Sequence, residues 1–259
     1  FMILLEAVNF GSASFGELRH EPGEVSGYFT VARGLTRAFE RGEAPSAQRL
    51  ARLGAAACAR LLGQESRPEA LPLMARFASS LRSLGEHVEE RYGGRFVGLV
   101  EAAGGQAPRL VERILEVPSF RDQAEHRGLT VRFFKRAQLL AADLSLALGG
   151  RGLGDLRGLD ELTIFADDLV PHVLRTDGIL RYDPALEARI ERGEDLGAGS
   201  EEEVEIRAAA VNAAERIVAE LRAAGREISP MQLDYCLWNR GLALRYGERP
   251  RHRAVTDFY

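Results

Sequence analysis

The chain has little of what would mark a secreted or membrane protein. Its 259 residues include two cysteines, Cys58 and Cys236, which form no CxxC pair. Both lie among apolar neighbours, so we expect two buried, reduced thiols rather than a disulfide. No apolar run approaches the roughly 20 residues that span a bilayer, and no basic-then-apolar leader is present. These absences predict a cytoplasmic protein with no membrane partner.

Signatures of metal and cofactor chemistry are also missing. The five histidines are scattered, without HExxH or another ligand spacing, so no metal site is expected. The sequence contains no GxSxG elbow, no Walker loop and no GxGxxG after a predicted strand. We therefore expect neither a metal nor an organic cofactor.

An excess of positive charge is missing too. The formal net charge is −4, whereas a duplex-DNA binder normally presents a basic stripe. A local basic cluster near the C-terminus (Arg245, Arg249, Arg251, His252 and Arg253) is too small to coat a nucleic acid. It is large enough to hold one phosphate, and no nucleic-acid partner is expected.

Helical periodicity is what the sequence has in abundance. Apolar residues recur every three or four positions from Phe77 to Tyr92, which is typical of an amphipathic helix ended by glycine. Further helices are predicted over 46–63, from Pro108, over 130–150 with Thr130 as cap, over 201–225 and from Ser229, and SFRD at 119–122 has capping-box character. One short strand is entertained, from Gly178 to Tyr182. We predict a single all-α domain over residues 1–259. Because the chain opens on Phe1 inside an apolar pattern, we also expect residues upstream of it.

Two segments carry the strongest chemical signal. Asp167 and Asp168 lie between apolar residues and Pro171, and an acid in such surroundings needs a cationic or hydrogen-bonding partner, or its pKa rises. Lys135 is a candidate partner, because the helix that carries it is apolar nearly all round. A lysine on such a face either extends to solvent or is held by an acid. Both readings stay open for Lys135.

Aromatic and amide residues give weaker signals. Asp234, Tyr235 and Trp238 share one predicted helix, where the aromatics are either core or a wall for a flat heterocycle. Asn9 needs a hydrogen-bond partner in its apolar helix, and Phe10 follows it.

These residues fall within motifs that resemble one family. The motifs are FFKRAQLLAADL (133–144), LTIFAD (162–167) with VP (170–171), EVEIR (203–207) and LDYCLW (233–238), in that order. Upstream LEAVNF (5–10), SGYF (26–29) and SFRD (119–122), and the ending with HR (252–253) and FY (258–259), fit as well. In this order they resemble the queuosine salvage proteins over nearly the whole chain.

The resemblance implies a function and a fold. Members hydrolyse the N-glycosidic bond of queuosine 5′-phosphate and release queuine for reuse in tRNA modification. Their helical fold is similar to that of helix-hairpin-helix DNA glycosylases, which implies a lysine and an aspartate in glycosidic chemistry, here Lys135 and Asp167. Such an enzyme would use Asn9, Phe10, Phe134, Asp234, Tyr235, Trp238, Arg251, His252 and Arg253 to hold its substrate.

The chain departs from the family at three positions. Asp168 stands where members usually carry an aromatic residue, His172 replaces a glutamine, and Ser145 replaces an aromatic residue. Two other functions stay open: a nucleic-acid base glycosylase on the same fold, and a non-catalytic helical protein that binds a nucleoside. The first would need a basic groove, and the second does not explain Lys135 with Asp167.

Overall fold

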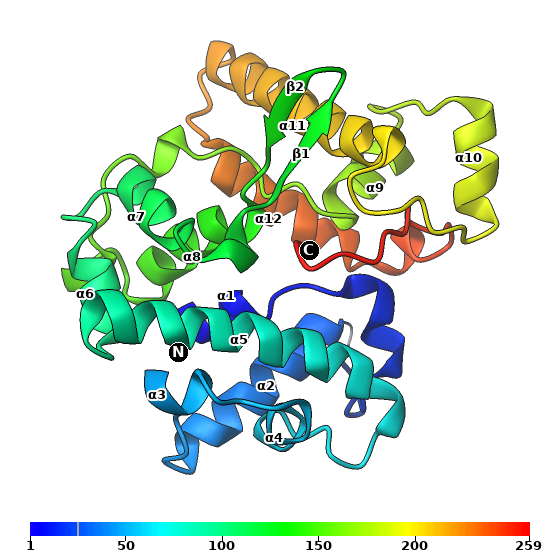
Figure 1. Cartoon of the computed structure of the whole chain (residues 1–259). Coiled ribbons are helices and arrows are strands. Elements are labelled where there is room, and N and C mark those ends of the chain that lie inside the picture. The colour runs from blue at the N-terminus through cyan, green and yellow to red at the C-terminus, as the bar shows by residue number, and fades with distance from the viewer. Residues whose placement is uncertain (25) are drawn as a thin grey trace. The chain divides into compact units, whose positions relative to one another are not determined.

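The computed structural model describes residues 1–24 and 26–259 (Figure 1). These residues form helices and, apart from isolated bridges, one two-stranded hairpin, so the all-α prediction holds except for the hairpin. The chain divides into two compact units. Unit 1 comprises Phe1–Arg121, Arg136–Arg157 and Asp257–Tyr259, and unit 2 comprises Asp122–Lys135 and Gly158–Thr256. Neither unit is one continuous stretch of chain. That the chain is a single domain stays a prediction.

Unit 1 is built around a long helix, α5, which starts at Leu71 and ends where Gly93 takes a left-handed conformation (φ 58°). The predicted helix over 46–63 is wrong as one piece, because it breaks after Leu50 and resumes at Ala55. The two pieces, α3 and α4, pack on the same side of α5 (Figure 1). The α-helices of unit 1 are α1 (Met2–Ala7), α2 (Gly27–Glu40), α3 (Ala47–Leu50), α4 (Ala55–Leu61), α5 (Leu71–Tyr92), α6 (Phe96–Glu101), α7 (Ala107–Ile114) and α8 (Lys135–Ala147), whose first residue belongs to unit 2. Its short helices include η1 (Ser12–Glu17), η2 (Pro68–Ala70) and η4 (Gly152–Gly154).

Glycine is required where α3 meets α5. A Cβ built on Gly85 would lie 2.6 Å from the carbonyl oxygen of Ala47 and 2.6 Å from the amide nitrogen of Ala51. Both are backbone atoms that cannot rotate away, so only glycine lets the two helices approach this closely.

The hairpin of unit 2 replaces a helix start that the sequence predicted. Strand β1 (Gln123–His126) pairs antiparallel with β2 (Leu129–Arg132), and Thr130 lies inside β2 instead of capping a helix. Arg127 and Gly128 form the two-residue turn with φ of 48° and 80°, as tight hairpins require. The short helix η3 (Pro118–Phe120) precedes the hairpin, so the capping box predicted there is also wrong. So is the predicted strand at 178–182, which has no strand pairing.

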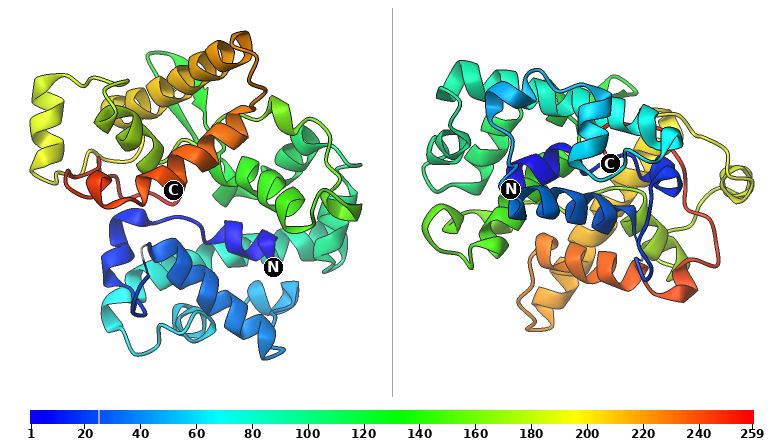
Figure 2. Two further views of the ribbon diagram at one scale, coloured as in Figure 1. Left: turned by 180° about the vertical axis from the view of Figure 1, so that it is seen from behind. Right: turned by 90° about the horizontal axis from the view of Figure 1, so that it is seen from below.

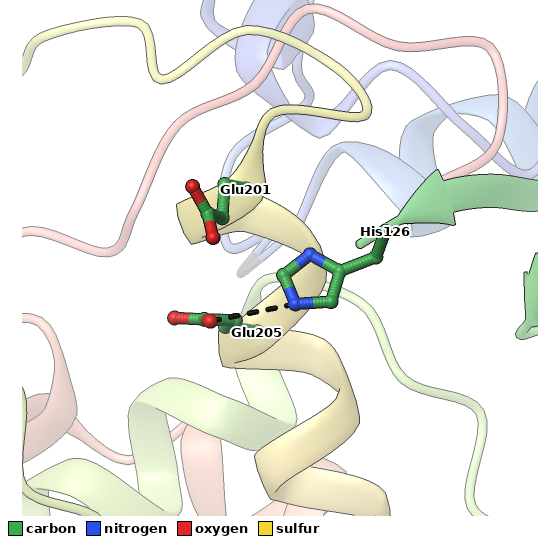
Figure 3. Close-up of side chains that lie close together, drawn as sticks. All are labelled: His126, Glu201 and Glu205. Carbon is green, nitrogen blue, oxygen red and sulfur yellow. Dashed lines mark ion pairs between the residues drawn. The ribbon is translucent and has the colours of Figure 1, made fainter. Parts of the chain in front are cut away.

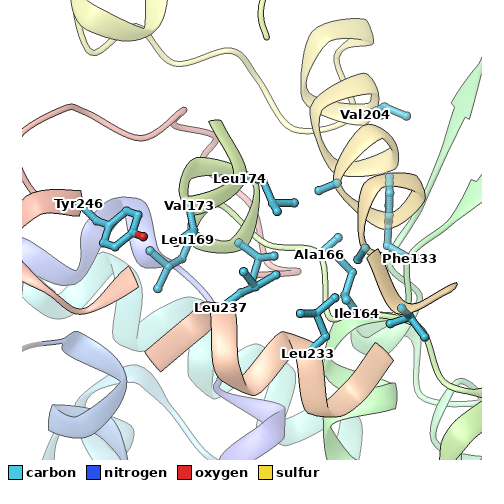
Figure 4. Close-up of a cluster of buried hydrophobic side chains, with 14 residues drawn as sticks. Phe133, Ile164, Ala166, Leu169, Val173, Leu174, Val204, Leu233, Leu237 and Tyr246 are labelled. Atoms are coloured by element: carbon cyan, nitrogen blue, oxygen red, sulfur yellow. The ribbon is translucent and has the colours of Figure 1, made fainter. Parts of the chain in front are cut away.

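Unit 2 contains an apolar core formed by several of its helices and the segment before α9. Its helices are η5 (Leu159–Glu161), α9 (Leu169–Thr176), α10 (Pro184–Glu191), α11 (Glu201–Ala223), α12 (Pro230–Gly241) and η6 (Leu244–Tyr246). Helices α9, α11 and α12 pack against one another, and the hairpin lies beside α11 (Figures 1 and 2). Ser200 caps α11, and Ser229 with Gln232 forms the predicted capping box of α12. Figure 4 shows the core that results, including Phe133, Ile164, Ala166, Leu169, Val173, Leu174, Val204, Leu233, Leu237 and Tyr246.

The two cysteines differ in their surroundings. Both are free thiols, and Cys58 is buried as predicted. Cys236 is exposed, which corrects the expectation, because it shares the solvent face of α12 with Gln232 and Asn239, four residues before it and three after.

Candidate active site

Asp167 is held at the start of α9. The residues before it, from Ile164 to Ala166, are buried, and Asp167 itself is 6% exposed. Its Oδ1 accepts hydrogen bonds from the amides of Leu169 (2.8 Å) and Val170 (3.0 Å). Asp167 therefore satisfies amides of the first turn and lies at the positive end of the helix dipole. The carboxylate of Asp167 is thus held by backbone amides.

The electrostatic balance at Asp167 favours the protonated form more than in water. Burial raises the pKa of its carboxyl above the ordinary 3.8, and the neighbouring charge of Asp168 raises it further. The positive charge of Lys135 and the two amide bonds lower the pKa of Asp167, but burial outweighs them. The positive charge of Lys135 is therefore one of the groups that influence the ionisation of Asp167.

Lys135 is the first residue of α8 and is also 6% exposed. Its amide donates a 3.3 Å hydrogen bond to Oδ2 of Asp122, whose carbonyl oxygen accepts from the amides of Phe133 and Phe134 (3.0 Å each). Phe134 has a φ of 50°, a left-handed conformation that side-chain-bearing residues seldom adopt. Asp122 therefore holds the backbone of Lys135 and of the two residues before it.

Helix α8 is apolar nearly all round, which predicted a buried helix. On the face that carries Lys135, Leu139 and Ala142 are buried, but Leu146 is 57% exposed. The prediction that the helix is buried is therefore wrong for its last turn.

A buried ion-pair network, which the sequence did not reveal, lies next to both residues. Arg207 on α11 pairs with Asp122 and, through NH1, with Glu203 at 3.1 Å. Its Nε donates a 3.0 Å hydrogen bond to the carbonyl oxygen of Ala166, the residue before Asp167. The sequence contained a signal for this network, because Asp122 lies in the motif SFRD and Glu203 and Arg207 lie in the motif EVEIR. Asp122 and Arg207, which pair, are 85 residues apart in the chain.

Helix α12 holds the loop before Asp167 from another direction. Oδ1 of Asp234 accepts a 2.8 Å hydrogen bond from the amide of Phe165. The ring of Tyr235 meets that of Phe165 edge-on, with centroids 5.9 Å apart. Trp238 is half-buried against the apolar core of unit 2, and Phe134 is half-buried as well. These contacts give Asp234 a structural task that the sequence did not predict.

The basic cluster near the C-terminus is not a cluster of cations ready for a ligand. His252 is buried, and burial followed by the charge of Arg207 lowers its pKa to about 3, so its ring is neutral at pH 7. This corrects its expected role as a cation. Arg251 lies 3.6 Å from Asp168, and Arg253 is exposed. The remaining two arginines of the cluster pair with acids, Arg245 with Asp177 and Arg249 with Glu187 and Glu191.

The two residues that replace family positions nearby are also engaged. Nε2 of His172 lies 2.7 Å from the carbonyl oxygen of Tyr246, and burial lowers the pKa of His172. Asp168, the acid that stands where family members usually carry an aromatic residue, has Arg251 as its ion-pair partner.

Asn9 and Phe10 belong to unit 1. Nδ2 of Asn9 donates to Oε2 of Glu6 at 2.9 Å. The ring of Phe10 is buried, with Phe77 edge-on at 4.9 Å and the guanidinium of Arg136 at 4.7 Å from its centroid. Arg136 also donates to the carbonyl oxygens of residues 6, 7 and 119. It fixes the segment that carries Asn9 and Phe10 to the rest of unit 1.

One group of side chains in the described ranges has the composition of a metal site. His126, Glu201 and Glu205 place possible ligand atoms within 4.8 Å of one another, and Figure 3 shows the 3.4 Å ion pair between His126 and Glu205. Arg127 already pairs with Glu201 (2.5 Å) and Glu205 (3.2 Å). Because one guanidinium contacts both carboxylates, we interpret the group as ion pairs that join the hairpin to α11.

A buried carboxylate and a lysine on a helical scaffold are the groups expected of a hydrolase that stabilises positive charge on its substrate. The chain belongs to the queuosine salvage protein family, which matches residues 1–259. It is 41% identical to the queuosine 5′-phosphate N-glycosylase/hydrolase of Sphaerobacter thermophilus, over all of this chain and 80% of that protein. The proteins of the same name are 30% identical in Mus musculus, over all of this chain and 81% of that protein, and 34% identical in Dictyostelium discoideum, over 73% and 59%.

The part of the chain described contains no helix with both the length and the apolar character needed to cross a membrane.

Proposed function

We propose that this chain is an N-glycosidase that hydrolyses queuosine 5′-phosphate and releases queuine. The observation that carries the proposal is Asp167: a buried carboxylate, fixed by two amides and adjusted by the charge of Lys135. The full-length similarity to enzymes named for this reaction supports the choice of substrate. The similarity to helix-hairpin-helix DNA glycosylases remains part of this proposal.

Asp167 acts in the ionised form. Cleavage of the bond between ribose and base builds positive charge on the sugar in an oxocarbenium-like transition state. A carboxylate beside the anomeric carbon stabilises that charge, and it orients or deprotonates the attacking water. Because Oδ1 serves the two amides, Oδ2 is the oxygen that we assign to the reaction. This chemistry requires neither a metal nor an organic cofactor.

Lys135 favours the ionised form of Asp167. Burial raises the pKa of this carboxyl and the positive charge of Lys135 lowers it, and only the ionised acid can stabilise an oxocarbenium ion. The ammonium group would also hold a sugar hydroxyl or assist departure of the base.

The remaining residues are assigned to substrate binding. In unit 2, Phe134, Tyr235 and Trp238 offer aromatic surface to the deazaguanine, and Asp234 offers its carboxylate. Asn9 and Phe10 belong to unit 1, and their part in substrate binding stays a prediction from the sequence. Arg251 and Arg253 would hold the 5′-phosphate, with His252 as a neutral hydrogen-bonding group.

A base-release assay tests the proposal. The chain is incubated separately with queuosine 5′-phosphate, queuosine, and a DNA duplex carrying uracil or oxoguanine, and the free base is quantified by mass spectrometry. We expect queuine from queuosine 5′-phosphate and no base from the duplex. Release from the duplex alone would identify a nucleic-acid glycosylase, and binding of queuosine 5′-phosphate without release would identify a non-catalytic binder.

A further inference from the structure

Arg207 joins the two segments that carry Asp167 and Lys135. One edge of its guanidinium, at Nε, is bonded to the carbonyl oxygen of Ala166, immediately before Asp167 (3.0 Å). NH1 and NH2 are bonded to the two carboxylate oxygens of Asp122, and Oδ2 of Asp122 accepts the amide of Lys135. A single planar group therefore lies between the backbones of the two functional residues.

We propose that Arg207 is a positioning residue that sets the placement of Lys135 relative to Asp167. The inference rests on the proposed function and deepens it: Arg207 touches no substrate and acts through the two residues that it aligns. Asp122 is its partner on the Lys135 side, and Glu203 holds the guanidinium from one turn earlier on α11.

The chemistry of the network suits alignment better than stability. Arg207 is 2% exposed, and buried ion pairs recover little more than their desolvation cost, so apolar residues of the same volume would stabilise the fold as well. Its bonds are directional, however, because the guanidinium presents donors in a rigid fork. The ring of Phe133, 3.8 Å from the guanidinium carbon, fixes the plane of that fork.

The anchors at either end are also stiff. On one side, Asp122 holds Phe133 and Phe134 through its carbonyl oxygen as well as Lys135 through its carboxylate. On the other side, Ala166 is followed directly by Asp167, whose Oδ1 is bonded to α9. Rotation of the Arg207 fork would therefore displace the carboxylate of Asp122, which accepts the amide of Lys135, relative to the carbonyl oxygen of Ala166.

Misalignment has a consequence that loss of stability does not. The charges of Lys135 and Asp168 act on the pKa of Asp167, and the charge of Asp167 in turn acts on that of His252. Arg207 is bonded to the carbonyl oxygen of Ala166, the residue before Asp167. If Lys135 moves away while the others remain, the pKa of Asp167 rises, because burial and Asp168 are then less opposed. The acid limb of the pH–rate profile moves to higher pH with it.

Arg207→Lys is the test variant, because it keeps the positive charge and removes the fork. With queuosine 5′-phosphate we expect kcat to fall about 10- to 100-fold, as misplacement of reacting groups by about 1 Å does. We expect KM to stay within about threefold, since no substrate contact is removed. The acid limb should move to higher pH, and Asp122→Asn, which breaks the same ion pair from its other end, should show the same two changes.

Arg175→Lys is the matched control. Arg175 is a buried arginine of unit 2 bonded to the carbonyl oxygen of Pro250 and, at 3.6 Å, to Glu191, and it is not bonded to Ala166 or Asp122. We expect this variant to have a lower melting temperature. Its kcat should stay within about twofold of the parent value, and the pH at which the acid limb falls should not change.

The outcomes separate the two proposals. If the parent chain releases no queuine, the proposed function fails. If the parent is active and folded Arg207→Lys keeps its kcat and acid limb, the positioning proposal is overturned. A loss of kcat that active-site titration attributes wholly to unfolded protein, with the acid limb unmoved, overturns it too. Should Arg207→Lys not fold, Asp122→Asn decides by the same criteria.

Discussion

At the scale of single residues, the candidate site depends on the opposing influences on the pKa of Asp167: burial and Asp168 raise it, and Lys135 and two amides lower it. The acid and Lys135 could be picked out from the sequence because ionisable residues are seldom surrounded by apolar ones without a reason. Arg207 could not be recognised as their link. Its bonds to Ala166 and Asp122 join positions far apart in the chain, and one sequence does not reveal which distant residues meet.

Lys135→Met tests one side of that balance. The variant keeps most of the stem and removes the charge that lowers the pKa of Asp167. The carboxyl should then need higher pH to ionise, so we expect lower activity and an acid limb moved to higher pH. The kcat/KM profile is measured against the parent with the same substrate, which cancels ionisation of the substrate phosphate near pH 6. An unmoved limb with full activity would show that Lys135 does not act on Asp167.

Asp168→Asn tests the other side and should have the opposite sign. Asp168 is a like charge that raises the pKa of Asp167, so its removal lets Asp167 ionise at lower pH. We expect the acid limb to move to lower pH while activity at pH 8 changes little. A shift in the same direction as that of Lys135→Met would contradict the assignment of charges. Because Asp168 also pairs with Arg251, KM is recorded separately.

At the scale of elements, the sequence predicted helices well and the hairpin not at all. Phe77 to Tyr92 and residues 201–225 have strong helical periods and capping signals, and both are helices. The hairpin was missed because its strands are mostly exposed and polar, without the apolar alternation that marks a strand. The run that follows Ser46 divides into α3 and α4, with Gly54 as the N-cap of α4, and both pieces pack on α5.

Gly85→Ala tests that packing. Alanine favours a helix over glycine by up to about 1 kcal/mol, but here its Cβ would meet backbone atoms of Ala47 and Ala51 at 2.6 Å. Overpacking costs typically about 1–3 kcal/mol, so a net loss of unfolding free energy is expected in urea titration. Glu86→Ala, at the exposed neighbouring position, should change little. A more stable Gly85→Ala would mean that α3 does not lie so close to α5.

The proposed role of the C-terminal arginines can be tested by comparing the nucleotide with the nucleoside as substrate. If Arg251 and Arg253 hold the 5′-phosphate, replacing both by alanine should lower the nucleotide-to-nucleoside ratio of kcat/KM. A charge-assisted contact is worth about 1.5–3 kcal/mol, or roughly 10- to 150-fold, and the exposure of these side chains favours the lower end. Arg249→Ala is the control, because Arg249 pairs with Glu187 and Glu191. Equal ratios in the parent and the double variant would place the phosphate elsewhere.

At the scale of the whole molecule, chain-long motifs predicted more than local patterns did. The order of the motifs indicated the family, which the match over residues 1–259 confirms. Interpretation of single residues was less accurate. His252 was expected to be a cation, yet buried and exposed side chains alternate along this segment and His252 is one of the buried ones. Burial depends on how the whole chain folds, so it cannot be read from the composition of a short cluster.

The central claim is that the charge of Asp167 drives the hydrolysis, and Asp167→Asn tests it most directly. The amide is nearly isosteric, and its oxygen can still accept the amides of Leu169 and Val170, so the fold of α9 is retained. We expect the rate of queuine release to fall by about two to four powers of ten, because the amide cannot offset an oxocarbenium charge. Calorimetry should show queuosine 5′-phosphate bound with affinity within about threefold of the parent. Release within about threefold of the parent rate would remove Asp167 from the reaction and contradict the account.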